Sequence, residues 1–377
     1  MNRTRQLLFE SAHRIIVKVG SNILTQDAGL NLTVIRSISH QISRLMDNGL
    51  EVILISSGAM ASGIRKIGLN QRPEEIPKRQ AIAAIGQAGL ILEYEKAFAK
   101  DQRKVAQLLF TSEDLNHRQR YLNTRNTLHT LLSWKIIPII NENDTVMVEE
   151  IKLGDNDNLA AMIALLMDAD VLISLTDIDG LYNKDPRAHA DAELIPKVVS
   201  YGRQIEAFAS AIPGRLGTGG MLGKIKAARK VTAAGVPMII AKGDNRDILL
   251  KLYRGDPYGT YFVPKTKKMP SRKSWIAYTL KPKGRIIIDQ GACKAIIDNG
   301  KSLLPSGIIQ VIGDFGIGAP VQMLDIEEEI LAHGLVNYDS NDIRKIMGLK
   351  TSQIKEQLGS KPYDEVIHRD NLVLTID

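Results

Sequence analysis

Residues 1–262 alternate between two patterns, and this alternation restricts the fold more than any other feature of the 377-residue chain. Short apolar runs with the length and composition of buried strands cover residues 14–19, 51–56, 104–110, 136–140, 171–175 and 236–241. Segments with apolar residues at helical spacing lie among them, at 33–48, 79–100, 117–134, 158–167, 222–234 and 245–253. Alternating strands and helices predict an α/β domain whose mainly parallel sheet is sandwiched by helices.

The pattern changes after residue 263. Residues 264–274 are polar and basic and lie between Pro264 and Pro270, which is typical of a linker. Beyond them, short apolar runs are separated by turns that contain Gly and Asp, which predicts a small, mainly β, barrel-like module. We therefore predict an α/β domain over 10–263, a linker over 264–279, a β domain over 280–360 and a C-terminal tail over 361–377.

Composition excludes several classes of protein. The longest apolar runs, such as 159–167, have nine residues, half of the ~18–20 that a membrane-spanning helix needs. The first 14 residues contain no apolar stretch of signal-peptide length. A single cysteine, Cys293, allows no intrachain disulfide and no cysteine-rich zinc or iron–sulfur site. We expect a cytoplasmic protein.

The chain is basic, with 49 Lys and Arg against 42 Asp and Glu, a net charge of +7. Residues 275–377 hold 11 basic and 14 acidic residues, net −3, so the positive charge belongs to the first two-thirds of the chain. A basic domain suggests a polyanionic partner, either nucleic acid or a phosphorylated small molecule.

Glycines follow two of the predicted strands and open one predicted helix. Lys18 and Gly20 follow the first strand, Ser57 and Gly58 follow the second, and residues 217–224 form a glycine-rich loop that ends in Lys224. Glycine lets backbone N–H groups approach an anion, and a helix N-terminus adds its dipole. The first two could equally be ordinary strand–helix turns and the third a hinge. The loop fits neither the Walker nor the dinucleotide-binding spacing.

Polar and acidic clusters follow two further strands and precede one helix. They cover residues 141–144, 154–158 and 176–182. Such side chains at strand ends can bind an amine, orient lysines or hold Mg²⁺, although plain helix capping by Asp155 or Asp157 is an alternative. In an open parallel sheet the carboxyl ends of strands form the ligand site, so the lysines, glycine turns and acidic clusters together suggest phosphoryl transfer.

These motifs, taken in order, resemble the amino acid kinase family, over nearly the whole chain. The residues that carry the resemblance are Lys18-Val-Gly-Ser, Ser57-Gly-Ala, Ile140-Asn-Glu-Asn-Asp, Gly-Asp-Asn156-Asp157-Asn, Thr176-Asp-x-x-Gly-Leu-Tyr-x-x-Asp-Pro-Arg and Gly217-Thr-Gly-Gly-Met. The C-terminal run from Gly284 through Ser302–Gly307 to Phe315 is similar to a PUA domain. One departure is Gly223, where the family usually has Thr, which puts one hydroxyl contact to the nucleotide in doubt.

The resemblance implies roles for individual residues. Lys18 and Lys224 would flank the transferring phosphoryl group, and Asp157 would orient both lysines. Ser57, Asp144 and Asn156 would hold the amino acid, with Asp144 as the partner of its α-ammonium group. The backbone N–H groups of Gly20 and Gly58 would contact phosphate. The ATP-binding residues would be Lys18, Thr176, Asp177, Thr218, Gly219, Gly220, Met221, Leu222, Gly223 and Lys224.

The resemblance also implies the reaction. It is ATP-dependent phosphorylation of the side-chain carboxylate of L-glutamate to L-glutamyl 5-phosphate, the first step of proline biosynthesis. Mg²⁺ would be bound mainly through the nucleotide, with no metal site of the protein's own. A carboxylate with a pKa of ~4.3 is already ionised near neutral pH, so the absence of an obvious general base fits this reaction. A homodimer or homotetramer, feedback inhibition by L-proline and functional coupling to glutamate-5-semialdehyde dehydrogenase are further implications.

Two other functions remain open from the sequence. A sibling kinase of the same fold could phosphorylate N-acetylglutamate or aspartate, but these enzymes usually carry a second Gly where this chain has Ser21. An RNA-directed role is the other, because PUA domains usually bind RNA. The acidic balance of the C-terminal module argues against RNA binding as the main role.

Overall fold

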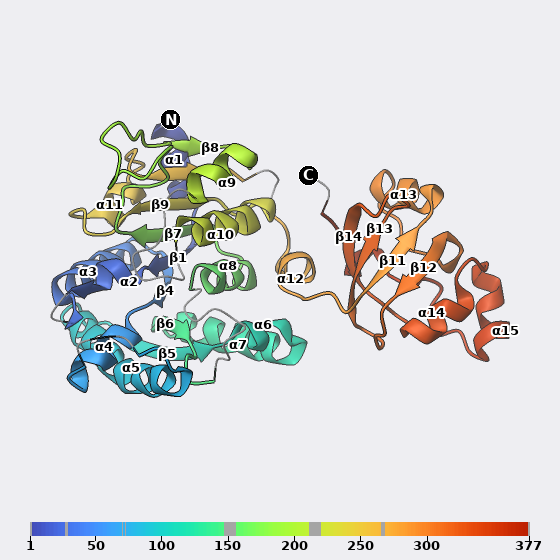
Figure 1. Cartoon of the computed structure of the whole chain (residues 1–377), viewed down its shortest axis with the longest axis horizontal. Helices are drawn as coiled ribbons and strands as arrows, with labels where there is room; N and C mark the ends of the chain where they lie inside the picture. Colours follow the sequence, from blue (N-terminus) through green and yellow to red (C-terminus); the bar gives the residue numbers. More distant parts are fainter. Residues whose placement is uncertain are drawn as a thin grey trace. The chain divides into compact units, whose positions relative to one another are not determined.

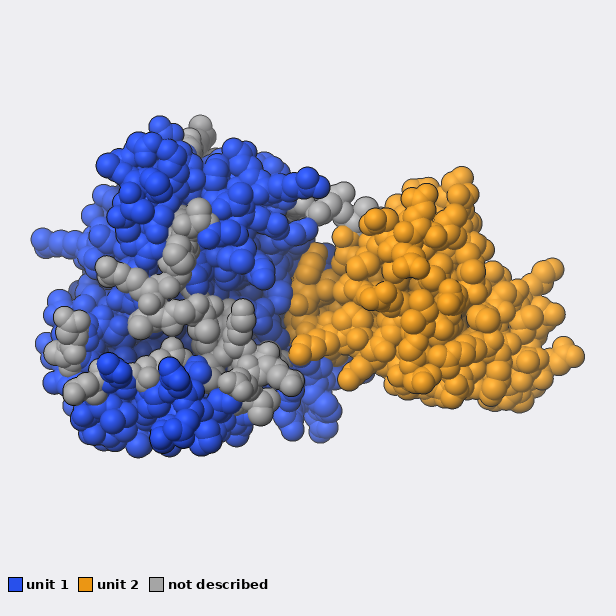
Figure 2. All heavy atoms as spheres, in the orientation of Figure 1, with its two compact units in different colours: residues 1–269 blue, residues 270–377 orange. Residues whose placement is uncertain are grey.

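The structure is a computed structural model that describes residues 2–26, 29–69, 71, 73–146, 156–210, 220–264 and 268–375. The chain divides into two compact units, residues 1–269 and 270–377, which Figure 2 shows in different colours. Within the described residues, no helix combines the length and the apolar character that crossing a membrane requires.

Unit 1 is built on an eight-stranded sheet with the order β5-β6-β4-β1-β7-β9-β10-β8. Its strands are β1 (Arg14–Val19), β4 (Glu51–Ser56), β5 (Val105–Phe110), β6 (Ile137–Glu142), β7 (Val171–Thr176), β8 (Lys197–Val198), β9 (Met238–Lys242) and β10 (Thr260–Phe262). In this sheet β10 pairs antiparallel with β9 and the other neighbours are parallel. A short hairpin, β2 (Thr25–Gln26) and β3 (Gly29–Leu30), lies outside it. The predicted mainly parallel sheet is confirmed.

Helices cover both faces of this sheet. They are α1 (Asn2–Glu10), α2 (Ser21–Leu24), α3 (Leu32–Asp47), α4 (Ala59–Lys66), α5 (Ile76–Ala99), α6 (Ser112–Asn116), α7 (Arg118–Ser133), α8 (Asn156–Leu166), α9 (Arg203–Ser210), α10 (Met221–Ala233) and α11 (Ile248–Tyr253). Figure 1 shows α3 on one side of the central strands and α8 and α10 on the other. This is the predicted layered α/β architecture.

Side chains alternate along β1, so successive residues of this strand point to opposite faces of the sheet. Ile15, Val17 and Val19 join the main core, to which α3 also contributes. Ile16 and Lys18 therefore point to the opposite face, where α8 packs on β1 and β7. A lysine is thus placed beneath a helix, 4% exposed, at the carboxyl end of a central strand.

Unit 2 has its own core around a five-stranded sheet with the order β12-β11-β13-β14-β15. Its strands are β11 (Gly284–Ile288), β12 (Ile308–Ile312), β13 (Pro320–Leu324), β14 (Ile330–Leu335) and β15 (Leu372–Leu374). Its helices are α12 (Ser271–Tyr278), α13 (Gln290–Ile297), α14 (Ser340–Ile346) and α15 (Ile354–Leu358), and three short 3₁₀ turns are η1 (Pro305–Gly307), η2 (Thr351–Gln353) and η3 (Arg369–Asn371). The predicted mainly β module is confirmed, and among the described residues β12 and β15 stand at the two ends of its strand order.

The boundaries of the units differ from the predicted domain limits in three places. The predicted linker over 264–279 contains helix α12, which packs on β14 and β15 and has Trp275 and Ile276 buried. The predicted tail over 361–377 contributes β15, which pairs with β14. At the other end, α1 precedes residue 10 and packs on α11, and its Arg5 is 1% exposed.

Candidate active site

The central strands bring two polar side chains to the face covered by α8 and α10. Lys18 on β1 is the register partner of Ser174 on β7, and both are buried. Side chains of register partners in parallel strands point to the same face. The first turn of α8 lies over this pair, and the first turns of α10 approach it from beside α8.

A buried carboxylate links two lysines from different elements at this place. Asp157, in the first turn of α8, accepts from Lys18 Nζ with Oδ1 at 2.8 Å and from Lys224 Nζ with Oδ2 at 3.0 Å. Ser174 Oγ donates to the same Oδ1 at 3.3 Å. All three charged side chains are at most 6% exposed. The structure therefore brings together the three residues predicted to be catalytic.

The charge of this cluster is fixed by its contacts. Burial alone would raise the pKa of Asp157, but the two neighbouring ammonium groups outweigh it and lower the pKa to about 2. Asp157 is therefore ionised at neutral pH. Two lysines and one carboxylate leave a net positive charge in a buried place, which attracts a phosphate group.

Asn156, next to this carboxylate, connects the ends of two strands, β4 and β6. Its Nδ2 donates to Ser57 Oγ at 2.8 Å and to Asn141 Oδ1 at 2.9 Å. Asn141 Nδ2 in turn donates to Gln87 Oε1 on α5 at 2.8 Å. The Oδ1 atom of Asn156 is buried without a hydrogen-bond partner among the described residues. A buried acceptor of this kind is suited to a donor that arrives with a ligand.

The other predicted substrate and nucleotide residues lie at neighbouring strand ends. Asp144 is half-buried in the turn after β6. Thr176 ends β7, and its hydroxyl donates to Asp177 Oδ1 at 3.0 Å. Asn22 Nδ2 donates to Asp177 Oδ2 at 2.9 Å. Burial raises the pKa of Asp177, but these two hydrogen bonds and the charge of Lys224 bring it below its usual value.

The two predicted phosphate-binding glycines differ from each other. The N–H of Gly20 donates to Leu175 O at 3.0 Å, because the hydrogen bonding between β1 and β7 continues one residue past β1. This N–H is already paired, which differs from the predicted contact with phosphate. A Cβ at Gly20 would lie 3.3 Å from Leu175 O, which is a tight contact, and 3.9 Å from Lys18 Nζ. Gly58 has a φ of +107°, which favours glycine, and α4 begins directly after it.

The glycine-rich loop is described in part. Thr218 and Gly219 lie outside the described residues. Gly220 precedes α10, whose first residue, Met221, is buried. Leu222 and Gly223 follow in the first turn, are half-buried and directly precede Lys224.

Three contact residues were not among the predicted site residues: Ser174, Asn141 and Asn22. A signal for Ser174 exists in the sequence, because a lone polar residue inside a buried apolar strand needs a partner. Asn141 lies inside a motif already described and Asn22 directly follows another, but their partners are distant in the chain: Asp177 after β7 for Asn22, and Asn156 on α8 for Asn141. Such pairings depend on strand order, which the pattern of a single sequence does not contain.

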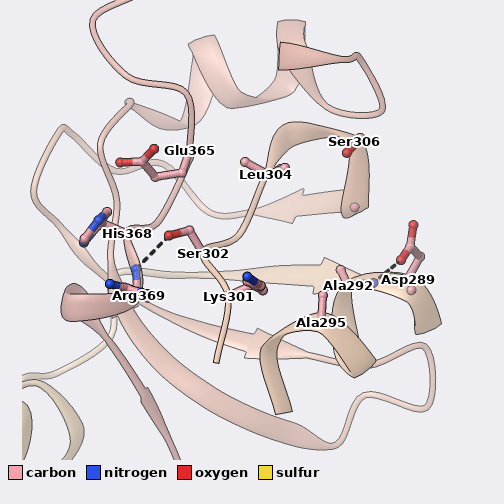
Figure 3. Close-up of a pocket in the computed structure, with 12 residues that line it drawn as sticks. Asp289, Ala292, Ala295, Lys301, Ser302, Leu304, Ser306, Glu365, His368 and Arg369 are labelled. Carbon is pink, nitrogen blue, oxygen red and sulfur yellow. Dashed lines mark hydrogen bonds between the residues drawn. The ribbon is translucent and has the colours of Figure 1, made fainter. Parts of the chain in front are cut away.

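Unit 2 carries a separate pocket of about 690 Å³. Figure 3 shows Glu365, His368, Arg369, Ser302 and Lys301 toward one side of it and Asp289 toward the other. The backbone N–H of Arg369 donates to Ser302 Oγ at 3.0 Å, and Asp289 Oδ1 accepts from Ala292 N. The pocket mixes two carboxylates with its cations, so it lacks the uniformly positive lining that strong phosphate binding uses.

The fold and the site define a class of protein that the comparisons with known sequences identify. Residues 13–242 match the amino acid kinase family, and residues 284–358 match the PUA domain. The chain belongs to the amino acid kinase family. Kinases of this kind transfer a phosphoryl group from ATP, which agrees with the buried positive cluster.

Within this family, the chain is similar to curated proteins of one kind. A glutamate 5-kinase of Syntrophus aciditrophicus is 50% identical over 374 residues, 99% of this chain and 97% of that protein. A glutamate 5-kinase of Thermoanaerobacter sp. is 49% identical over 362 residues, 96% of this chain and 97% of that protein. One of Geobacter sulfurreducens is 46% identical over 371 residues, 98% of this chain and all of that protein. The likeness therefore spans both units.

Proposed function

We propose that this protein catalyses the ATP-dependent phosphorylation of the side-chain carboxylate of L-glutamate, forming L-glutamyl 5-phosphate and ADP. The observation that carries the proposal is the buried Lys18–Asp157–Lys224 cluster at the carboxyl ends of the central strands. The near full-length similarity to proteins named glutamate 5-kinase supports glutamate as the acceptor. The product is a precursor in proline biosynthesis.

The chemistry needs positive charge more than a base. The acceptor carboxylate is ionised at neutral pH and attacks the γ-phosphorus directly, while the bond to the bridging oxygen of ADP breaks. Both reactants are anions, so the main obstacle is repulsion. Lys18 and Lys224 would neutralise the charge that develops on the transferring group and the leaving oxygen, and Asp157 holds their ammonium groups in place.

The acceptor would lie beside Asn156 and Asp144. The unpaired Oδ1 of Asn156 can accept from the α-ammonium group of glutamate, and the carboxylate of Asp144 supplies the opposite charge. Ser57, already bonded to Asn156, completes this side. Thr176, Asp177 and the loop before α10 would form the nucleotide side, with Lys224 between the two substrates.

The described residues do not suit a metal site made by the protein alone. Both oxygens of Asp157 are bonded to lysines, and both oxygens of Asp177 accept from Asn22 and Thr176. No group of three or more metal-binding side chains gathers among the described residues. Mg²⁺ would thus be carried mainly by the phosphates of ATP, where it supplies charge neutralisation.

Several properties follow from the resemblance alone and remain predictions. They are a homodimer or homotetramer, inhibition by L-proline, coupling to glutamate-5-semialdehyde dehydrogenase and a cytoplasmic location. None of them enters the mechanism above.

A coupled assay of ADP release tests the proposal. The purified full chain is supplied with MgATP and, in turn, L-glutamate, N-acetyl-L-glutamate and L-aspartate. We expect turnover with L-glutamate and a kcat/KM at least about a hundredfold lower with the other two, because each leaves polar groups of the site without their partners. A preference for N-acetyl-L-glutamate or L-aspartate would assign the chain to a sibling kinase.

A further inference from the structure

We propose that Thr260 is a positioning residue for the nucleotide: its buried hydroxyl closes the base of the loop that follows Asp177. This inference rests on the proposed assignment of Thr176 and Asp177 to the nucleotide side of the site. Thr260 itself begins β10 and lies outside the predicted site residues.

The hydroxyl of Thr260 makes two hydrogen bonds to different segments. It accepts from the backbone N–H of Leu181 at 2.8 Å and donates to the backbone oxygen of Ile195 at 2.6 Å. The side chain is 0% exposed, so water cannot replace either bond. One hydroxyl group thus satisfies a donor and an acceptor that are 14 positions apart in the chain.

These two contacts lie at the base of a hairpin-like loop. Ile195 N donates to Leu181 O at 2.8 Å, and Tyr182 forms an isolated antiparallel bridge with Leu194. Asn183 N donates to Glu193 O at 3.1 Å. The loop leaves the sheet at Thr176 and Asp177 and returns at Ile195, so whatever fixes its base also fixes the turn that carries Asp177.

Glycine at position 180 makes this close packing possible. A Cβ at Gly180 would lie 2.5 Å from Thr260 Oγ1 and 2.9 Å from Thr260 N. The turn from Asp177 to Leu181 therefore lies directly against Thr260. Gly180 is three residues from Asp177, so we expect a loss of this contact to displace Asp177 through the backbone of the same turn.

The position of Thr260 is fixed from the other side by a buried arginine. Arg5, on α1, donates to the backbone oxygen of Tyr258 at 2.6 Å, of Pro196 at 3.1 Å and of Gly259 at 3.3 Å. Gly259 has a φ of +72°, and a Cβ there would lie 2.1 Å from Ile240 O. The residues on both sides of the Thr260–Ile195 contact are thus held to α1 and β9.

The test compares Thr260→Val with Thr260→Ser. Valine keeps the shape of threonine but removes both hydrogen bonds, whereas serine keeps the hydroxyl. For Thr260→Val we expect the KM for ATP to rise about five- to tenfold, while the KM for L-glutamate changes less than about twofold. Thr260→Ser should behave like the wild type in both constants.

A second variant and a direct binding measurement distinguish an effect on ATP binding from a general effect on the fold. Gly180→Ala pushes the turn away from Thr260 with the hydroxyl in place, so the same selective rise in KM for ATP is expected. Calorimetric titration with a non-hydrolysable ATP analogue should show the same weakening without any acceptor. This measurement stands even if wild-type chain fails to phosphorylate glutamate, which would contradict the proposed function alone.

Three results would overturn the inference. Wild-type affinity for the ATP analogue in both Thr260→Val and Gly180→Ala would show that the contact does not position the nucleotide site. Equal weakening of ATP and glutamate would indicate general loosening of the fold. Loss of ATP affinity in Thr260→Ser as large as in Thr260→Val would exclude the hydroxyl as the cause.

Discussion

The carboxylate of Asp157 is stable in its buried position because two lysines compensate it. Asp157→Asn keeps the shape but removes the carboxylate charge that both Lys18 and Lys224 contact, and we expect a loss of about 3–5 kcal/mol in the free energy of unfolding at pH 7. Urea denaturation of the two proteins measures this difference. A loss below about 1 kcal/mol would mean that the lysines find other partners.

The stabilising effect of Asp157 should also depend on pH. The pKa of Asp157 is lowered to about 2 in the folded chain, against about 3.9 in an unfolded one, so its stabilising contribution is fully present above about pH 4 and is lost as the pH falls toward 2. The difference in stability between wild type and Asp157→Asn should therefore shrink over this range. Thermal unfolding at pH 7, 4, 3 and 2 measures it, and a constant difference would contradict the assigned pKa.

Lys224 should act mainly in the transition state. Lys224→Ala is expected to lower kcat by about 10²–10³-fold, about 3–4 kcal/mol, with a much smaller rise in the KM for glutamate. Lys226 lies on the same helix but is exposed, so Lys226→Ala is the matched control and should keep kcat within about twofold of the wild type. Similar kcat values for the two variants would contradict the proposed role of Lys224 in the transition state.

Asp144→Asn should affect the other substrate. It removes the charge proposed to pair with the α-ammonium group of glutamate and keeps the shape, so the KM for glutamate should rise about tenfold or more while that for ATP stays within about twofold. Steady-state kinetics with each substrate varied in turn gives both constants. An equal rise in the KM for ATP would place Asp144 on the nucleotide side instead.

At the scale of residues, the sequence predicted the charged centre but not its hydrogen bonds. Lys18, Asp157 and Lys224 are far apart in the chain, and the strand-end rule together with the family resemblance placed them in one site. The pairing of Gly20 N–H with Leu175 O was missed because it depends on β7 lying beside β1. Strand order is a property of the whole sheet, and no local pattern encodes it.

At the scale of elements, the packing of α4 on α5 depends on two glycines. A Cβ at Gly86 would lie 1.8 Å from Ala59 O, and one at Gly63 would lie 1.9 Å from Ile82 O. Helix α4 begins directly after Gly58, so this contact also fixes the turn that carries Ser57. The backbone atoms involved cannot move without separating the helices.

Gly86→Ala should therefore destabilise unit 1 by about 3 kcal/mol or more, because a methyl group is forced against backbone. Gly202→Ala is the control, since its Cβ would meet no atom within 4 Å and its φ is not positive. Urea denaturation of both variants measures the effect. Equal stability of the two would mean that α4 and α5 move apart at little cost.

The accuracy of the predicted elements follows from their length and burial. Strands β1 and β4 match their predicted limits because each is a six-residue, mainly apolar and β-branched run that begins at a charged residue, Arg14 or Glu51. Strands β8 and β10 have two and three residues, too few to show a period, and were missed. Helix α12 resembles a linker in sequence because its eight residues contain two lysines or arginines and two serines, while its apolar residues Trp275 and Ile276 are adjacent rather than periodic.

At the scale of the whole molecule, every described side chain of the proposed chemistry belongs to unit 1, and each unit has its own core. The last residues of unit 1 contact other residues of the same unit. Lys268 Nζ lies 2.5 Å from Asp170 Oδ1, and Met269 N donates to Ala234 O at 2.9 Å. A chain that ends at Met269 keeps these contacts. It should fold and phosphorylate glutamate with a kcat within about tenfold of the full chain. A folded but inactive truncation would mean that unit 2 helps to build the site.

Unit 2 alone should bind RNA weakly. Residues 270–377 carry 13 Lys and Arg against 14 Asp and Glu, so they offer little net attraction to a polyanion, and two carboxylates, Asp289 and Glu365, line their pocket. Whatever affinity the full chain has for RNA should therefore come from unit 1, where the positive charge lies, and should fall steeply between about 50 and 200 mM salt. Filter binding of both proteins to one RNA at these two salt concentrations measures this. Tight, salt-resistant binding by residues 270–377 would instead point to recognition of bases and not phosphates, and would give unit 2 an RNA-directed role of its own.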